Sequence, residues 1–412
     1  MAETEIGLGK QGRRGYSLDE VAIVPSRRTR DADEVEVSWQ VDAYQFGLPV
    51  IAAALDGVTS PTTAVEMDRL GGAGALHLEG LWCRHDDPTR LLDQVAGHRP
   101  GRGNGGRAGD AGSGDAGAGD AGAGDAGAGD AGAEDGVALL RAAYDAPVRP
   151  ELVEQRVAEI RDAGATVVVA VSPSRTESLL PTIKKVEPDL LVIQGTVTSA
   201  EHVSSGTHDP LDLKHLVRRL EVPVIVGGCA SYQAALHLMR TGAAGVLVGV
   251  GTGLTSTTGG VLGVGNPQAT AIADARAARM RHLDETGVYV HLIADGGMAT
   301  GGDIAKAVVC GADAVMLGSP LAAAVEAPAQ GALWSMASFH PRLPRGSLRR
   351  VPRLGSLEEI LLGPSQRADG RTNLIGGLRK AMAVTGHGTL KELQKAELVV
   401  TAPPSVRPGA QR

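Results

Sequence analysis

The chain has 412 residues, carries a formal net charge of −7, and is 43% hydrophobic but only 2% aromatic. This length allows one large α/β barrel or two domains. A core with so few aromatic rings must be built from Ala, Val, Leu and Ile, which suits a barrel of small branched side chains. The negative charge and the scarcity of aromatic residues argue against a protein that reads nucleic acid.

Cysteine usage and hydropathy narrow the class of protein further. Cys83, Cys229 and Cys310 lie far apart and form no C-x-x-C spacing, which argues against a disulfide framework or a zinc site. The N-terminal segment has no apolar stretch typical of a secretion signal, and no run approaches the ~18 apolar residues that would span a bilayer. We therefore expect a cytoplasmic protein that does not cross a membrane.

Short apolar runs recur along the chain and predict strands. They are nearly continuous stretches of Val, Ile and Leu rather than alternating patterns, which is typical of parallel strands buried on both faces. In chain order, the predicted strands are residues 48–53, 74–78, 166–171, 189–194, 222–226, 245–250, 289–294 and 314–318.

Helical patterns alternate with these strands. The predicted helices are residues 61–70, 150–163, 177–186, 211–220, 232–241, 268–286, 303–311 and 373–385. Eight strand-then-helix units close most simply as a (β/α)8 TIM barrel. A doubly wound open sheet is the alternative, but it needs a glycine-rich fingerprint after its first strand, and Ala54-Leu55-Asp56-Gly57 is not one.

A low-complexity segment interrupts the pattern. Within residues 101–135 a pentad of Gly-Asp-Ala-Gly followed by Ala or Ser repeats. It spaces the acidic residues five apart, at Asp110, Asp115, Asp120, Asp125 and Asp130. Such a composition cannot bury enough apolar surface to offset chain entropy, and the spacing does not fit the nonapeptide repeat that binds calcium. We predict that residues 1–100 and 136–400 form the barrel, that 101–135 is a disordered Gly/Ala/Asp insertion, and that 401–412 is a disordered tail.

Three glycine-rich loops follow predicted strands and are candidate anion sites. The sequence GVLVGVGTGLTSTTGGVLGVGNPQAT (245–270) leads from a strand through a loop into a long helix, and Asp295-Gly296-Gly297 and Gly318-Ser319 follow the last two strands. Barrels often hold phosphate in the loops after strands seven and eight, and a carboxylate accepts hydrogen bonds from ribose hydroxyls. Tight βα turns recruit the same residues, so this alternative stays open for each loop alone.

The same segments resemble the IMP dehydrogenase/GMP reductase family. Residues 245–270 are similar, without gaps, to the catalytic loop of that family, and IADGGMATGGDIAKAVVCGADAVMLGS is similar to its passage from strand seven to strand eight. YSLDEVAIVPS, LPVIAAALDGVTS, LGGAGALH and VPVIVGGCAS resemble further motifs, so that about two thirds of the chain lines up. The repeat segment stands where the family usually carries a pair of CBS domains, which points to the related branch that lacks them.

The resemblance implies an oxidoreductase of purine nucleotide metabolism and GMP biosynthesis, with NAD or NADP as its hydride partner. It also implies a homo-oligomeric assembly, with a tetramer as the expected size. It implies catalytic roles for Ser256 and Thr258. It implies that IMP or GMP binds at Gly253, Asp295, Gly296, Gly297, Gly318 and Ser319. The cofactor would lie beside Gln194, Gly195, Thr196, Gly249, Val250 and Gly251. A monovalent cation, K+, would be held at Gly251, Gly253 and Ser256.

The departures from the family fall on residues of the chemistry. Ser256 replaces the cysteine that attacks the purine, Leu254 replaces a phosphate-contacting serine, and Gln194 replaces an aspartate. A hydroxyl supplies essentially no nucleophilic anion at neutral pH without a base. Three hypotheses follow: an active oxidoreductase, a purine-nucleotide-binding pseudoenzyme, or a different enzyme on the same barrel.

The cysteines and an arginine-rich segment are each explained without a catalytic role. Cys229, where the family has asparagine, follows the fifth predicted strand and is the one cysteine placed at the active rim. Cys310 falls on a predicted helix away from that rim, and packing is the default role of both thiols. No arginine–tyrosine pair of the family's flap is recognisable in residues 339–355, and the arginines there are expected to face water: Arg342, Arg345, Arg349 and Arg350.

Overall fold

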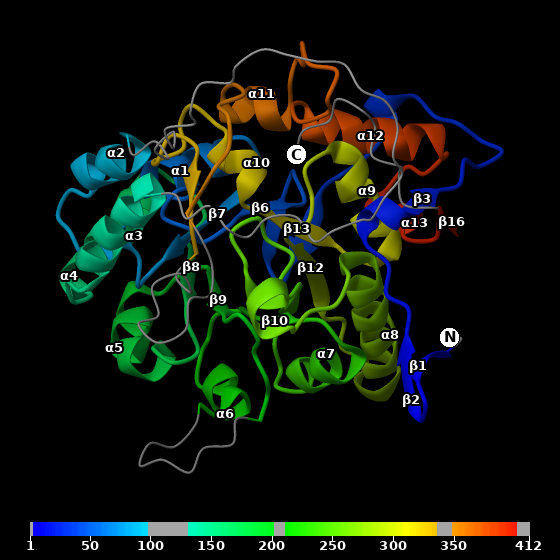
Figure 1. The fold of residues 1–412 in the computed structure, drawn as a ribbon, viewed down its shortest axis with the longest axis horizontal. Helices are drawn as coiled ribbons and strands as arrows, with labels where there is room; N and C mark the ends of the chain where they lie inside the picture. Colours follow the sequence, from blue (N-terminus) through cyan, green and yellow to red (C-terminus); the bar gives the residue numbers. More distant parts are fainter. Residues whose placement is uncertain (1–2, 98–130, 202–210, 336–347, 402–412) are drawn as a thin grey trace, which may run out of the picture.

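Eight parallel strands close into a barrel at the centre of the molecule (Figure 1). The structure is a computed structural model that describes residues 3–97, 131–201, 211–335 and 348–401. Around the barrel the strands follow one another in chain order, with the last pairing with the first. They are β6 (Val50–Ala52), β7 (Ala73–His77), β8 (Val168–Val171), β9 (Leu190–Gln194), β10 (Val224–Cys229), β11 (Gly245–Val248), β12 (His291–Asp295) and β13 (Ala314–Leu317).

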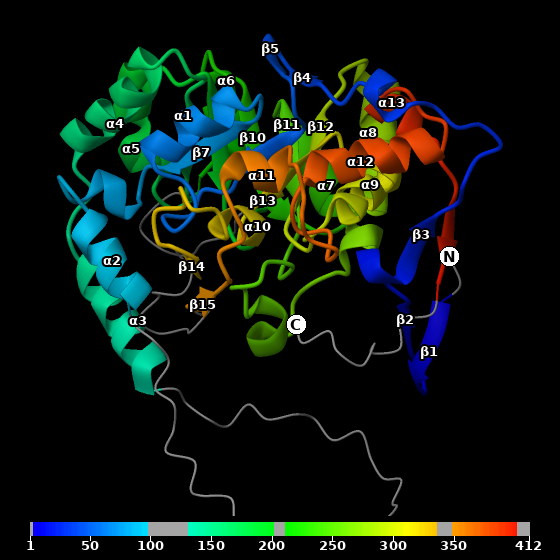
Figure 2. The ribbon, with the colours of Figure 1, turned by 90° about the horizontal axis from the view of Figure 1, so that it is seen from above.

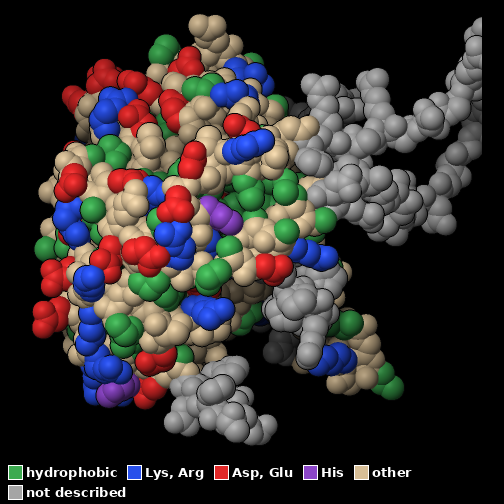
Figure 3. Space-filling view, turned by 90° about the vertical axis from the view of Figure 1, so that its left-hand side faces the viewer, with side chains coloured by type: hydrophobic (Ala, Val, Ile, Leu, Met, Phe, Trp, Pro, Cys, Tyr) green, Lys and Arg blue, Asp and Glu red, His purple; other side chains and the backbone are tan. Residues whose placement is uncertain are grey.

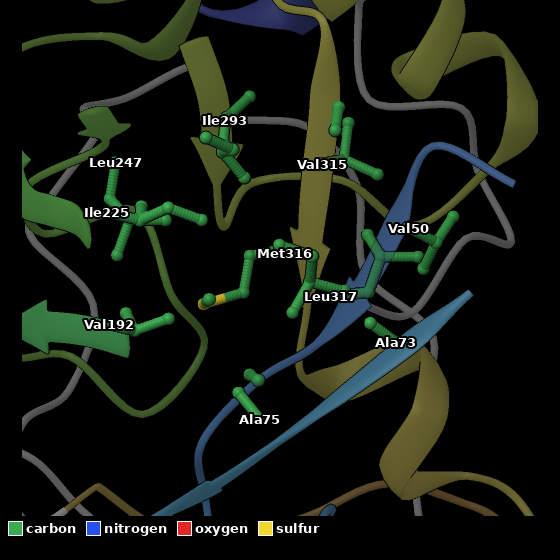
Figure 4. Close-up of a cluster of buried hydrophobic side chains, with 14 of the residues drawn as sticks. Val50, Ala73, Ala75, Val192, Ile225, Leu247, Ile293, Val315, Met316 and Leu317 are labelled. Atoms are coloured by element: carbon green, nitrogen blue, oxygen red, sulfur yellow. The ribbon is translucent and has the colours of Figure 1, made fainter. Parts of the chain in front are cut away.

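The strands are buried because their side chains are apolar on both faces. All residues of β6, β7, β8, β11 and β13 are buried. Figure 4 shows side chains such as Val192, Leu247 and Met316 from separate strands meeting in one cluster. In-register pairs such as Val315 with Val50 close the barrel between its last and first strands. Small branched residues fill such a barrel without aromatic rings, as the composition predicts.

Helices surround the barrel and separate successive strands (Figures 1 and 2). Capping explains where several begin: Ser60 accepts a hydrogen bond from the amide of Thr63, and Thr300 accepts one from the amide of Asp303. The principal helices are α1 (Pro61–Arg69), α4 (Pro150–Asp162), α5 (Thr176–Val186), α6 (Leu213–Arg218), α7 (Tyr232–Met239), α8 (Gln268–Thr286), α9 (Gly301–Cys310) and α12 (Leu374–Val384).

The TIM barrel and its eight predicted strands are confirmed, with shifts at the ends of elements. The largest shift is at the fifth strand, which was predicted to end at residue 226 but continues through Gly227 and Gly228 to Cys229. Both glycines pack against backbone, since an added Cβ would lie 2.5 Å from the Leu247 oxygen or 2.4 Å from the Gly249 oxygen. The predicted helix 373–385 is present as α12, which packs beside α9.

Short elements without periodicity were missed. They include four antiparallel pairs: β1 (Glu3–Gly7) with β2 (Lys10–Arg13), β4 (Trp39–Val41) with β5 (Tyr44–Phe46), β3 (Val21–Ile23) with β16 (Leu398–Val400), and β14 (Ala332–Leu333) with β15 (Arg349–Arg350). The β3–β16 pair joins the two ends of the described chain. Three short helices complete the fold: α10 (Ser319–Ala322), α11 (Leu357–Leu361) and α13 (Leu390–Leu393).

Two further helices flank the repeat segment. They are α2 (Thr89–Gly97) and α3 (Ala131–Tyr144), so the last five residues of the predicted insertion, 131–135, belong to a helix. Residues 98–130, most of the predicted linker, and 402–412 of the predicted tail lie outside the described residues. Because α4 follows this segment and precedes β8, the insertion lies within the second β/α unit, between β7 and its helix α4.

The α2–α3 pair forms a small second core beside the barrel. Leu92 and Val95 of α2 and Leu140 of α3 pack with Trp334. The Trp334 indole donates to the Tyr144 hydroxyl at 2.9 Å. That hydroxyl in turn donates to the buried carboxylate of Asp56, which lies in the loop after β6. Hydrogen bonds thus connect the helical pair to the rim of the barrel.

Two further features of the described residues are the distribution of surface charge and the hydropathy of the helices. On the face shown in Figure 3, Lys and Arg side chains are intermingled with Asp and Glu. Among the helices of the described residues, none is both long enough and apolar enough to cross a lipid bilayer.

Candidate active site

A cavity of about 200 Å³ opens at the carboxyl ends of the barrel strands. This is the end at which barrel enzymes place their sites. Loops after β6, β9 and β11 converge there, together with the last residues of β7 and β12. Its described lining is Ala53, Ala54, Leu55, His77, Gln194, Gly195, Thr196, Gly249, Gly251, Thr252, Gly253, Thr255, Ser256, Thr258, Asp295 and Ser335.

The glycine-rich loop after β11 is fastened to the end of β12. The Thr252 hydroxyl donates to the backbone oxygen of Asp295 at 2.7 Å, and the Gln268 amide donates to the Val248 oxygen at 2.9 Å. Gly249 has a φ of 156° and lies so close to β12 that an added Cβ would be 2.1 Å from the Asp295 oxygen. No residue with a side chain fits at 249 without displacing β12.

Ser256 lies in this loop beside Thr258. Its hydroxyl donates to the Thr258 hydroxyl at 3.0 Å and accepts from the Thr258 amide at 3.3 Å. A π-helical turn, η4 (Thr258–Leu262), follows directly. Within the described part of the chain, Ser256 makes no hydrogen bond to an imidazole or a carboxylate. Its hydroxyl is therefore held by the loop and not by a base.

Asp295 is the only carboxylate of the described lining. It ends β12, and the Gln194 side chain, which ends β9, donates to its Oδ2 at 2.8 Å. Burial raises the pKa of Asp295 to about 6, and the Gln194 hydrogen bond opposes that rise. A carboxylate with one neutral donor retains lone pairs for further donors. Asp295 can therefore accept hydrogen bonds from a ligand.

Most of the predicted site residues meet at this cavity. Gln194, Gly195, Thr196, Gly249, Gly251, Gly253, Ser256, Thr258 and Asp295 all line it. Val250 is buried below the loop, 5% exposed, and is not part of the lining. Val250 stands between Gly249 and Gly251, which do line the cavity, and its place beside the cofactor stays a prediction.

The predicted phosphate loops lie beside the cavity and not in its lining. Gly296 and Gly297 have φ angles of 80° and 77°, which favour glycine and turn the chain away from β12. Gly318 lies against the rim, where an added Cβ would be 3.4 Å from the Leu55 side chain. Ser319 is the first residue of α10. Gly296 and Gly297 directly follow Asp295 in the chain, and Gly318 lies beside the lining residue Leu55.

Neither cysteine considered as a nucleophile is in a reactive setting. Cys229 is 1% exposed, burial raises the pKa of its thiol to about 12, and it does not line the cavity. Burial likewise raises the pKa of Cys310 to about 12, and this residue ends α9. Both thiols are packing residues, as their default role predicted.

His77 is a lining residue that the sequence analysis missed. It is the last residue of β7 and lines the same cavity as Ser256. The signal was present, because His77 falls within the predicted strand 74–78, whose carboxyl end must reach the active rim. Leu55, Thr252, Thr255 and Ser335 also line the cavity without having been predicted.

The three residues predicted to hold a monovalent cation, Gly251, Gly253 and Ser256, lie in one loop after β11 and line the cavity. The Gly253 oxygen accepts a hydrogen bond from the Ser256 amide at 2.9 Å, which leaves one lone pair of that carbonyl. Among the described residues there is no group of three or more His, Cys, Asp or Glu side chains that could hold a metal ion.

The sequence profile of the IMP dehydrogenase/GMP reductase domain matches residues 15–409, nearly the whole chain. The barrel, its rim loops and this match together define the class: the chain belongs to the IMP dehydrogenase/GMP reductase family. An inosine-5'-monophosphate dehydrogenase of Haemophilus influenzae is 32% identical over 292 residues, which cover 64% of this chain and 55% of that protein.

Closer relatives share the full length of the chain. A protein of Mycolicibacterium smegmatis, named an uncharacterized oxidoreductase, is 47% identical over 96% of this chain and 99% of its own length. A crystal structure of an IMP dehydrogenase/GMP reductase-like protein from Corynebacterium glutamicum superposes with a TM-score of 0.85 at 41% identity, covering 97% of this chain and 98% of that one.

Proposed function

We propose that this protein is an NAD(P)-dependent oxidoreductase that acts on a purine nucleoside monophosphate, IMP or GMP. The observation that carries the proposal is Asp295: a single carboxylate with spare acceptor capacity, placed between the glycine-rich loops at the active rim. Membership of the IMP dehydrogenase/GMP reductase family supports the substrate class and the use of NAD or NADP.

Each part of the nucleotide has a complementary part of the rim. The ribose hydroxyls donate to Asp295. The phosphate lies against the backbone of Gly296, Gly297 and Gly318 and the hydroxyl of Ser319, where glycines allow close approach. The purine ring lies over the Ser256–Thr258 loop. A cavity of about 200 Å³ suits the reacting rings, while the phosphates extend along the rim.

The cofactor side of the cavity is formed by Gln194, Gly195 and Thr196 together with Gly249 and Gly251. These residues fit a flat ring, because the glycines add no side chain and Thr196 supplies a polar group. NAD or NADP, when bound, accepts or supplies the hydride. Gln194 connects the two halves, since it lies on the cofactor side and hydrogen-bonds the nucleotide carboxylate.

A second candidate is nucleotide binding without turnover, and the geometry of Ser256 favours it. The family's covalent step needs a nucleophile at this position, and a serine needs an adjacent base to act as one. The Ser256 hydroxyl contacts Thr258 instead. On this account the protein is a purine-nucleotide sensor or a partner of an active relative.

One assay separates the two candidates. NADH formation from IMP, and NADPH consumption with GMP, are measured for the parent protein and for Ser256→Ala, with nucleotide binding followed by calorimetry. Turnover that disappears in Ser256→Ala supports the oxidoreductase with serine as a working nucleophile. Binding without turnover supports the second candidate, and the absence of both removes the purine nucleotide.

We further infer a cytoplasmic homo-oligomer, with a tetramer as the expected size, and a K+ site at Gly251, Gly253 and Ser256. Apolar side chains around the catalytic loop support assembly, since Leu254, Val261 and Val264 are 51%, 53% and 47% exposed and a second copy would cover them. Light scattering tests the assembly, and thermal melting in KCl against choline chloride tests the cation.

A further inference from the structure

His77 is oriented by the chain in a way that fixes which of its ring nitrogens carries the proton. The residue is 8% exposed and lines the cavity together with Ser256 and Thr258. The amide of Glu79 donates a hydrogen bond to His77 Nδ1 at 3.1 Å. A backbone amide can only donate, so Nδ1 must hold a lone pair, and in the neutral ring the proton lies on Nε2.

The donor that fixes the ring is itself held in place. The Glu79 carboxylate accepts a hydrogen bond from the Ser172 amide at 2.6 Å, and the backbone carbonyl oxygen of Glu79 accepts one from Arg84 Nε at 2.8 Å. Glu79 is 7% exposed. The backbone beside His77 is therefore anchored to the loop after β8 and to Arg84, and rotating the amide away from Nδ1 would break these contacts.

The remaining nitrogen is available to a ligand. Within the described part of the chain, His77 Nε2 has no hydrogen-bond partner. Accepting a proton from Ser256 at Nε2 requires a lone pair on that nitrogen, and therefore the tautomer with its proton on Nδ1. That tautomer cannot accept the hydrogen bond from the Glu79 amide. The geometry therefore argues against His77 as the missing base of Ser256.

We propose that His77 is a fixed donor, which gives a hydrogen bond from Nε2 to an acceptor atom of the molecule bound in the cavity. It is a positioning residue for that ligand, and the acceptor is an oxygen or nitrogen lone pair of the nucleotide. The choice of ligand rests on the proposed function, whereas the tautomer rests on the contacts of the free protein alone.

Two substitutions separate the functions of the two nitrogens. In His77→Gln the side-chain amide reaches the place of Nε2 and keeps a donor in the cavity. In His77→Asn the shorter amide can still accept from Glu79 but presents no donor there. We expect calorimetry with IMP to give a Kd within about threefold of the parent for His77→Gln and roughly tenfold weaker for His77→Asn.

The control is His215→Asn, on the exposed surface of α6, which should bind IMP like the parent. Thermal melting of all variants shows whether each is folded. A His77→Asn variant that is folded and binds IMP as tightly as the parent would remove His77 from the ligand site. Equal losses in His77→Asn and His77→Gln would show that the donor is not the feature that matters.

A second measurement does not depend on the ligand. Nitrogen NMR of the ring in the free protein at neutral pH should show an unprotonated Nδ1 and a protonated Nε2 for His77. The opposite tautomer would overturn the proposal even if IMP binds. If the expected tautomer is found and neither IMP nor GMP binds the parent, the proposed function fails, and the fixed donor is then tested with whichever nucleotide a thermal-shift screen detects.

Discussion

Two aspartates at opposite ends of the barrel, the half-buried Asp295 and the buried Asp313, differ in how completely the protein pairs their carboxylates. Asp295 ends β12 at the active rim, and Asp313 lies just before β13 at the other end. Asp313 is held by Arg279 at 2.8 Å, by Lys391 at 2.6 Å and by the Tyr289 hydroxyl at 2.8 Å. Asp295 has one neutral side-chain donor, Gln194.

The pKa shifts of the two carboxylates differ in sign for this reason. Burial raises the pKa of both groups, but at Asp313 the charges of Arg279 and Lys391 outweigh burial, and its pKa is lowered. At Asp295 burial prevails and the pKa rises to about 6. A carboxylate such as Asp313, whose oxygens are fully paired within the protein, stabilises the fold. A carboxylate such as Asp295, with fewer partners, can still accept hydrogen bonds from a ligand and adds less to stability.

The largest expected effect is the loss of stability when the carboxylate of Asp313 is removed. Asp313→Asn leaves the guanidinium of Arg279, which is 2% exposed, as a buried charge without its partner. We expect the free energy of unfolding to fall by about 3–5 kcal/mol, measured by urea denaturation at pH 7. The matched control is Asp295→Asn, and equal losses in the two variants would contradict the distinction between the sites.

The next effect is on binding. Asp295→Ala removes the carboxylate to which the ribose hydroxyls would donate. The variant should bind IMP or GMP roughly tenfold more weakly or worse, as expected for the loss of a charge-assisted hydrogen bond of about 1.5–3 kcal/mol. Calorimetry with the folded variant measures the Kd. An unchanged Kd would exclude Asp295 from the site.

A smaller effect is the pH dependence of stability at Asp295. A carboxyl whose pKa is raised in the folded state gives stability that is complete at low pH and is lost as the pH rises through about 6. The parent should therefore lose about 1–3 kcal/mol relative to Asp295→Asn between pH 4.5 and 7.5. Urea melts across this range test it, and parallel curves for the two proteins would be the contrary result.

The smallest effect concerns Gln194, whose side-chain amide donates a hydrogen bond to the Asp295 carboxylate. Gln194→Ala removes that donor, so the pKa of Asp295 should rise by roughly half to one pH unit. Gln194→Glu brings a second carboxylate beside the first and should raise the pKa of the pair further. Carboxyl carbon NMR follows both. An unchanged pKa of Asp295 in both variants would show that the hydrogen bond from Gln194 does not affect its protonation.

The sequence predicted the scaffold and the ends of its strands well, because continuous apolar runs carry the signal of a parallel barrel. Asp295 was found because it directly follows such a run, and Ser256 was found because its loop resembles the catalytic loop of the family. The hydrogen bond between Gln194 and Asp295 joins residues 101 apart and depends on how the barrel closes, which no local pattern contains.

Other features were missed for physical reasons as well. His77 was counted as part of a strand, and its tautomer depends on the Glu79 amide two residues further on. The hairpins β1–β2 and β4–β5 are only three to five residues per strand, too short for a periodicity to show. Helix α3 begins among Gly and Ala residues that composition assigns to a linker.

The pH dependence of IMP affinity tests most directly whether Asp295 is the ligand carboxylate. The phosphate of IMP also titrates near pH 6, so the informative quantity is the ratio of the parent's affinity to that of Asp295→Asn, measured by calorimetry from pH 5 to 8. We predict a ratio of about ten or more above pH 7 that falls towards one below pH 6, as Asp295 gains its proton. A ratio that stays constant across this range would contradict the account.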